Sequence, residues 1–147
     1  ALLGNPRLII VDEPTAGLDP AERFRFHNLL AEISEDVVVV LSTHIVSDVS
    51  DLCQNMAILA QGRVVLTGRP LELVAALGGK IWRKFVTLEE LGALQQQRLP
   101  IIALRRVAGR RLVHVFAEAR PEGFEGAEPD LEDVYFRAVA APGGEGR

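Results

Sequence analysis

The sequence has little of several features that mark particular classes of protein. Its single cysteine, Cys53, cannot form an internal disulfide, and no second thiol stands at the spacing of a metal site. A lone cysteine is most often a small core residue, so we expect Cys53 to be buried. The longest continuous apolar runs, such as 37–41, are far shorter than the ~20 residues that cross a bilayer. The composition therefore excludes a disulfide scaffold and predicts no membrane span.

An excess of positive charge is also lacking. The formal net charge is -4, and the excess of acidic residues lies in residues 1–80. A general binder of nucleic acid or of anionic membranes needs clustered positive potential, which this balance does not supply. The arginine pairs at 105–106 and 110–111 flank a predicted turn without interleaved aromatic residues. We therefore expect them to form a solvated face and not a nucleic-acid patch.

A phosphate-binding glycine loop is missing. Nowhere among the 147 residues is there a Gly-x-x-x-x-Gly-Lys-Ser/Thr pattern. The Gly-Gly-Lys at 78–80 fails it, because Val74 stands where the first glycine is required and Ile81 where the hydroxyl is required. The chain begins at Ala1 without a secretory leader and has one methionine, Met56. We expect residue 1 to be an internal position of a longer protein.

Hydrophobic patterning, in contrast, is strong, and 48% hydrophobic residues suffice for a globular core. Apolar periodicity predicts a helix tail at 1–5, strands at 8–11, 37–41, 56–60, 63–67, 81–86, 101–106 and 111–117, and helices at 20–33, 46–52, 71–77, 88–97 and from 130 onward. The Gly, Glu and Pro content of 120–129 predicts a loop. The strand, helix and strand over 8–41 form a βαβ unit, and their unbroken apolar runs predict parallel strands covered on both faces.

Polar residues come directly after the first two predicted strands. Asp12 and Glu13 come after 8–11, and His44 comes after 37–41. The carboxyl ends of neighbouring parallel strands meet at one edge of a sheet, so we expect these side chains to lie together. Asp12 suits a Mg²⁺ site, because that ion takes oxygen ligands and keeps several waters. Glu13 could orient or deprotonate a water near a terminal phosphate.

Less specific interpretations compete with this site. An isolated Asp-Glu pair before proline more often begins a turn, and an isolated histidine is more often a packing or surface residue. We assign the latter interpretation to His27 and His114. The order and spacing of Asp12, Glu13 and His44 favour a role in metal binding or catalysis for these three residues.

These motifs resemble ABC transporter ATP-binding subunits. Residues 8–13, Leu-Ile-Ile-Val-Asp-Glu, look like the Walker B strand of that family. Residues 16–19, Ala-Gly-Leu-Asp, resemble its D-loop, and His44 in Ser-Thr-His resembles its switch histidine. The predicted hairpin at 57–68 and the Pro-Leu-Glu-Leu at 70–73 are similar to the segment that the family has after its switch histidine.

The resemblance implies ATP and Mg²⁺ as cofactors. By it, Asp12 would bind nucleotide through the Mg²⁺ shell and Glu13 would be the catalytic base. His44 would contact the terminal phosphate and assist catalysis, and Asp19 would communicate across a nucleotide-bound dimer.

The implied fold is α/β: the C-terminal part of a P-loop NTPase (RecA-like) ABC ATPase domain at 1–80, followed by a small α+β accessory domain at 81–147. Residues 129–135, Pro-Asp-Leu-Glu-Asp-Val-Tyr, are similar to the ending of ABC-2-type exporter subunits. The Walker A loop, the glutamine loop and the signature motif of the family are absent, so we expect the chain alone to be inactive.

The implied function is an ATP-hydrolysing subunit at the cytoplasmic face of a membrane. It would drive export through a separate permease, pair with a second ATPase protomer as a homodimer, and bind no nucleic acid. One alternative is a DNA-repair or chromosome-maintenance ATPase of the same type, although the hairpin after His44 and the acidic balance count against it. Another is a non-enzymatic module in which 81–147 mediates dimerisation.

Overall fold

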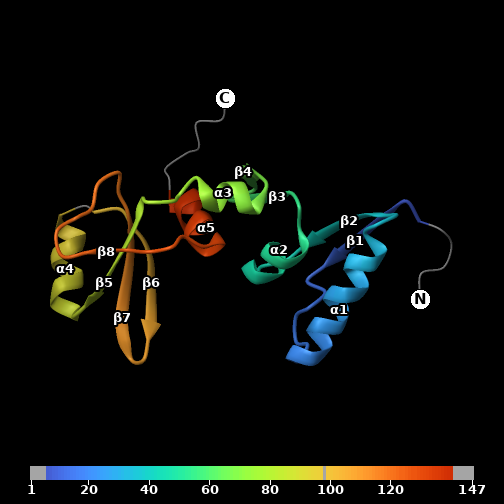
Figure 1. Ribbon diagram of the computed structural model, residues 1–147, viewed down its shortest axis with the longest axis horizontal. Coiled ribbons are helices and arrows are strands. Elements are labelled where there is room, and N and C mark those ends of the chain that lie inside the picture. The colour runs from blue at the N-terminus through green and yellow to red at the C-terminus, as the bar shows by residue number, and fades with distance from the viewer. Residues whose placement is uncertain (1–5, 98, 141–147) are drawn as a thin grey trace. The chain divides into compact units, whose positions relative to one another are not determined.

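The computed structural model describes residues 6–97 and 99–140, so the helix tail predicted at 1–5 lies outside the described residues. The chain divides into two compact units, Ala1–Gln54 and Asn55–Arg147 (Figure 1). The division after Gln54 lies earlier in the chain than the domain boundary predicted after Lys80. The boundary after Lys80 stays a prediction. In the described part of the chain, no helix combines the length and apolar character needed to cross a bilayer.

The first unit is a strand, helix, strand and helix. Strand β1 (Leu8–Asp12) pairs in parallel with β2 (Val38–Ser42), and helix α1 (Pro20–Ile33) connects them. Helix α2 (Val46–Leu52) follows β2 (Figure 1). The predicted α/β class and parallel pairing are confirmed, since parallel neighbours need a crossover connection such as α1.

Local sequence explains where α1 begins. The Asp19 carboxylate accepts a hydrogen bond from the Glu22 amide at 2.8 Å, and Pro20 occupies the first turn. This cap satisfies one of the free amides of the first turn, and proline costs nothing there because its missing amide has no helical partner. Asp19 is thus an N-cap in this structure.

Burial of β1 and β2 differs from the prediction. Four apolar side chains on alternate positions are about half exposed or more: Leu8, Ile10, Val38 and Val40. The expectation of cover on both faces is therefore wrong for the described residues. An unbroken apolar run predicts burial on both sides, but burial requires a second layer, and the described residues leave one side of this two-stranded sheet open.

The second unit begins with a hairpin. Strands β3 (Met56–Ala60) and β4 (Arg63–Gly68) pair in antiparallel fashion, as predicted, around Gln61 and Gly62, whose φ angles are 50° and 74°. Two consecutive positive φ values are typical of the type I′ turn, which matches the twist of paired strands. Helix α3 (Pro70–Ala75) follows.

The rest of this unit contains a four-stranded sheet in the order β6-β7-β5-β8. Its elements are β5 (Ile81–Val86), α4 (Leu88–Gln96), β6 (Ile101–Val107), β7 (Arg110–Phe116), β8 (Glu125–Gly126) and α5 (Leu131–Ala140). All its pairings are antiparallel. β6 lies at one edge of this sheet, and β7 lies in its interior between β6 and β5.

One core lies between this sheet and α4. Its buried residues are Val86, Leu94, Val113, Val115 and Phe124. Phe124 comes from 120–129, which was predicted to be only a loop. In the structure this segment buries the Phe124 ring in the core, and its β8 pairs with β5. The local sequence pattern does not reveal this burial, because it depends on the sheet and helix that surround the ring.

Helix α5 is held by charged contacts to the sheet. Asp130, its preceding residue, receives two hydrogen bonds from Arg105 at 2.8 and 3.0 Å, and the buried Asp133 contacts His114 at 2.9 Å. Arg137 stacks over the Phe116 ring at 4.2 Å. The solvated face predicted for the arginine pairs is thus wrong for Arg105, because the acidic start of α5 neutralises this side chain.

A pocket of about 430 Å³ lies in this unit and includes Arg83, Arg105, His114 and Asp130 in its lining. None of these is a predicted site residue. Arg105 already has carboxylate partners, although its buried Nε is unpaired. The pocket therefore lies apart from the predicted site residues, which all belong to the first unit.

The lone thiol is less enclosed than expected. Cys53 caps the end of α2 and is half-buried, not fully buried. Partial burial raises the pKa of the Cys53 thiol, and the negative charge of Asp48 raises it further. Such a thiol is a poor nucleophile at neutral pH, which agrees with a structural role.

Candidate functional site

The register of the parallel strands brings the first acidic residue to the sheet edge. Asp12 and Ser42 are paired at the last position of β1 and β2. The Ser42 hydroxyl donates a hydrogen bond to the Asp12 carboxylate, which is exposed. An exposed carboxylate at the end of a strand is accessible to a hydrated cation and can bind it.

Glu13 leaves the strand in a restricted conformation. Its φ of 45° lies in the left-handed region, which is uncommon for a residue with a side chain. The Glu13 amide donates to the Ser42 carbonyl at 2.8 Å, which extends the pairing of the two strands by one step. This backbone geometry turns the Glu13 side chain toward the segment after β2.

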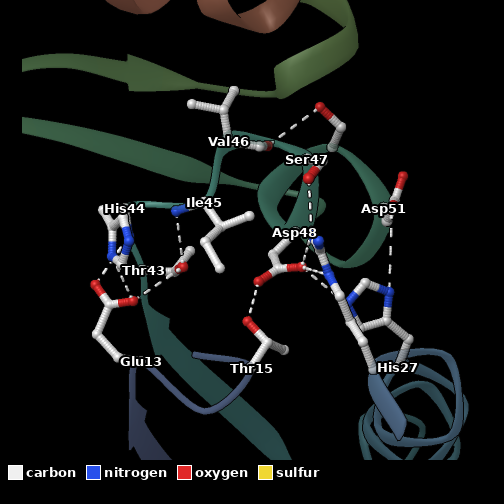
Figure 2. Close-up of polar contacts among 12 residues, drawn as sticks. Glu13, Thr15, His27, Thr43, His44, Ile45, Val46, Ser47, Asp48 and Asp51 are labelled. Carbon is white, nitrogen blue, oxygen red and sulfur yellow. Dashed lines mark hydrogen bonds and ion pairs between the residues drawn. The ribbon is translucent and has the colours of Figure 1, made fainter. Parts of the chain in front are cut away.

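Glu13 and His44 meet, as the sequence predicts. His44 Nδ1 lies 2.7 Å from Glu13 Oε2, and the His44 amide donates to Glu13 Oε1 at 2.9 Å. Thr43 Oγ1 adds a longer contact to Oε2 at 3.4 Å and accepts from the Ile45 amide at 3.0 Å. Figure 2 shows this group beside the ends of the strands. The His44 side chain is 76% exposed, so its ring can reach a bound ligand.

The other predicted residues are placed less directly. Asp12 stands next to Glu13 in sequence but binds Ser42, and Asp19 caps α1. Neither carboxylate has a hydrogen bond or ion pair to Glu13 or His44 within the described residues. The structure therefore brings together two of the four predicted residues.

Asp12 is the residue that could hold a metal. Among the described residues no three His, Cys, Asp or Glu side chains gather as a metal site. A protein cage is not what Mg²⁺ requires, because this ion usually binds one or two carboxylates, waters and substrate phosphates. The exposed Asp12 carboxylate beside the Ser42 hydroxyl fits that pattern.

Sequence reasoning missed a second cluster in the same unit, centred on Asp48. The Asp48 side chain is fully buried and accepts hydrogen bonds from Thr15, from Arg23 Nε at 2.8 Å, and from His27 Nε2, which lies 2.9 Å away. Arg23 also donates to Ser47 Oγ at 2.6 Å. Figure 2 shows Thr15 and His27 pointing toward Asp48.

Charge explains how Asp48 can be buried. Burial by itself raises the pKa of this carboxyl, but the hydrogen bonds from Thr15, Arg23 and His27 and the positive charge of Arg23 lower it overall. Asp48 is thus ionised and compensated. The sequence contained only a weak signal: Asp48 lies between Val46 and Val49, but α2 also contains Ser47, Ser50 and Asp51, so its residue pattern does not mark Asp48 as buried.

Comparison with known proteins connects this geometry to a family. No protein-family model matches the chain. ABC transporter A family member 8 of Dictyostelium discoideum is 40% identical over 76 residues, covering 52% of this chain and 9% of its own length. Human phospholipid-transporting ATPase ABCA7 is 33% identical, covering 92% and 8%. Mouse cholesterol transporter ABCA5 is 32% identical, covering 78% and 7%.

A solved structure of an ATP-binding subunit of an ABC transporter is 30% identical, covers 62% of this chain and 37% of its own, and has a TM-score of 0.44. The chain spans about a tenth or less of the length of these three curated relatives. The sequence similarity to these relatives places the chain in the ABC transporter family, as a counterpart of one segment of its members.

Proposed function

We propose that this chain is part of an ATP-hydrolysing subunit of an ABC transporter. The observation that carries the proposal is the contact of Glu13 with His44 at the carboxyl ends of two parallel strands, one residue beyond Asp12. Ligands of open α/β sheets bind outside this edge. A base, a histidine and a metal-binding acid at one such edge are the groups that nucleotide hydrolysis needs.

Each residue has a distinct role in the proposed reaction. Glu13 orients the attacking water and accepts its proton. His44, held by Glu13 at Nδ1, presents its exposed ring to the terminal phosphate. Asp12 binds waters of the Mg²⁺ shell, and the ion neutralises phosphate charge when bound. Asp19 serves contacts across a dimer with a second protomer.

The 147-residue chain is proposed to be inactive by itself. It contains no Gly-x-x-x-x-Gly-Lys-Ser/Thr loop, whose amides and lysine cradle the β and γ phosphates. Without that loop, Glu13 and His44 have no phosphate held in place for attack. The activity belongs to a longer protein that carries this chain.

The proposed setting is the cytoplasmic face of a membrane, where the subunit drives export through a separate permease of the ABC-2 type. Residues 1–80 serve nucleotide binding and hydrolysis, and residues 81–147 serve contacts with the permease or a second protomer; this is a division of function and not of folding units. Because two relatives are named as a cholesterol transporter and a phospholipid-transporting ATPase, a lipid is the first class of cargo to test.

Substitution of the base tests this proposal. In a longer protein carrying the chain, Glu13→Gln keeps the volume and hydrogen bonding of the side chain but removes the base. We expect ATP turnover to fall about a hundredfold or more while ATP affinity is retained. Glu35→Gln, at an exposed position of the same unit, is the matched control and should keep full turnover. Hydrolysis by Glu13→Gln at nearly the original rate would place the base elsewhere.

A further inference from the structure

The buried Asp48 carboxylate joins separate segments of the first unit. Thr15 belongs to the turn after β1, Arg23 and His27 belong to α1, and Asp48 itself lies on α2. A buried carboxylate is tolerated only while its partners remain in place, because losing them leaves an uncompensated charge. The cluster therefore fixes where these segments lie relative to one another.

Two of these segments also carry the candidate site. Thr15 comes two residues after Glu13, and Asp48 comes four residues after His44. The turn after β1 and the segment after β2 are thus tied twice, by the Glu13–His44 contact and by the Thr15–Asp48 hydrogen bond (Figure 2). Two separated ties fix both the distance and the orientation between the segments.

The Glu13–His44 contact and the Thr15–Asp48 hydrogen bond differ in strength. His44 is 76% exposed, and contacts between exposed groups are weakened by water and by the entropy of holding the side chains. Asp48 and Thr15 are almost completely buried, where a hydrogen bond to a charged group is stronger. The buried Thr15–Asp48 hydrogen bond is therefore the contact that can hold the exposed Glu13–His44 pair in position.

We propose that Asp48 is a positioning residue that, through Thr15, holds Glu13 and His44 in contact. The inference rests on the function proposed for that pair and adds to it a residue that touches neither of the reacting groups. Arg23 and His27 supply the compensating contacts that keep Asp48 ionised inside the unit.

Thr15→Val is the informative change, because it conserves shape, removes the hydroxyl, and leaves Arg23 and His27 on Asp48. Thr15→Ser is the conservative rescue, since serine retains the hydroxyl. Asp51→Asn is the matched control: Asp51 lies on the same helix, its side chain is 60% exposed, and its one ion pair among the described residues is with His27, at 4.0 Å. Circular dichroism establishes that each variant is folded.

Hydrogen exchange of the His44 amide, measured by NMR on the chain, is the first readout, since this amide donates to Glu13. We expect exchange to be about tenfold faster in Thr15→Val, and unchanged in Thr15→Ser and Asp51→Asn. Unchanged exchange in a folded Thr15→Val variant overturns the proposal, as does a lack of protection in the unsubstituted chain. If Thr15→Val does not fold, Arg23→Met removes another partner of Asp48 and must give the same local response.

Steady-state kinetics on a longer protein carrying the chain is the second readout. We expect Thr15→Val to lower kcat about tenfold and to leave KM for ATP within about twofold, with Thr15→Ser restoring kcat. A kcat unaffected by Thr15→Val overturns the proposal. The exchange measurement needs no nucleotide, so an unsubstituted protein without ATPase activity would reject the proposed function while exchange still decides the positioning role.

Discussion

His114 Nδ1 lies 2.9 Å from Asp133 Oδ1, and this contact joins the interior strand β7 to helix α5. Both side chains are buried, Asp133 completely. Asp133 also lies 3.5 Å from Arg105 and accepts from the Asp130 amide at 3.2 Å. A single carboxylate thus anchors the start of α5 to the sheet.

Removing that carboxylate should destabilise the second unit strongly. We expect Asp133→Ala to lower the free energy of unfolding by about 3–5 kcal/mol, because His114 and Arg105 lose a buried partner. Glu132→Ala is the control: Glu132 also pairs with Arg105 but is 52% exposed, so its loss should cost about 0–1 kcal/mol. Urea denaturation of both variants measures the difference. Equal effects would show that burial of Asp133 is unimportant.

Lowering the pH should reduce the stability of both units, because specific carboxyl groups in each become protonated. Burial raises the pKa of Asp130, but its hydrogen bonds from Arg105 and from the Asp133 amide lower it overall, and Asp48 is lowered by its own partners. A carboxyl whose pKa is lower in the folded state stabilises the fold above its unfolded pKa, about 3.9, and this contribution is lost as the pH falls through the folded pKa. We therefore expect stability to be constant near neutral pH and to fall below about pH 4.

Unfolding by urea at pH 7, 5, 4 and 3 measures this dependence. Asp130→Asn should make the acid loss of stability smaller, because asparagine does not titrate. Asp51→Asn, at an exposed position, should leave the pH profile as it is. A profile that Asp130→Asn does not change would mean that other groups govern acid unfolding.

The chain alone should not bind ATP tightly. Asp12, Glu13 and His44 are at the strand edge, but no glycine loop is present to hold the phosphates. Isothermal calorimetry with Mg-ATP should give no affinity in the micromolar range. Micromolar binding, or steady phosphate release that Glu13→Gln abolishes, would contradict this expectation.

Truncations should distinguish the predicted boundary after Lys80 from the division at Gln54. Helix α5 contacts β3, β4 and α3 as well as β6, so a cut after Lys80 separates elements of one compact unit. We expect residues 55–147 to unfold cooperatively on heating, and 81–147 to have a lower melting temperature. Circular dichroism on both peptides measures this. Equal melting temperatures would support the boundary after Lys80.

Local patterns in the sequence were sufficient for the order of the described elements, except β8, and for the Glu13–His44 pair. Parallel strands followed from two apolar runs joined by a capped helix, and the pair followed from the position of each residue just past a strand. The hairpin turn at 61–62 was also predictable from the sequence, because its residue types fix a backbone conformation that depends on few neighbours.

The tertiary structure alone decided which polar residues became buried partners. Thr15 and Asp48 are 33 positions apart, and Arg105 and Asp130 are 25 apart, so no helical or strand period relates them. The burial of Phe124 and the exposure of Ile10 also depend on which segments cover them. Periodicity reports the conformation of one segment, whereas burial and charge compensation depend on distant segments meeting in the fold.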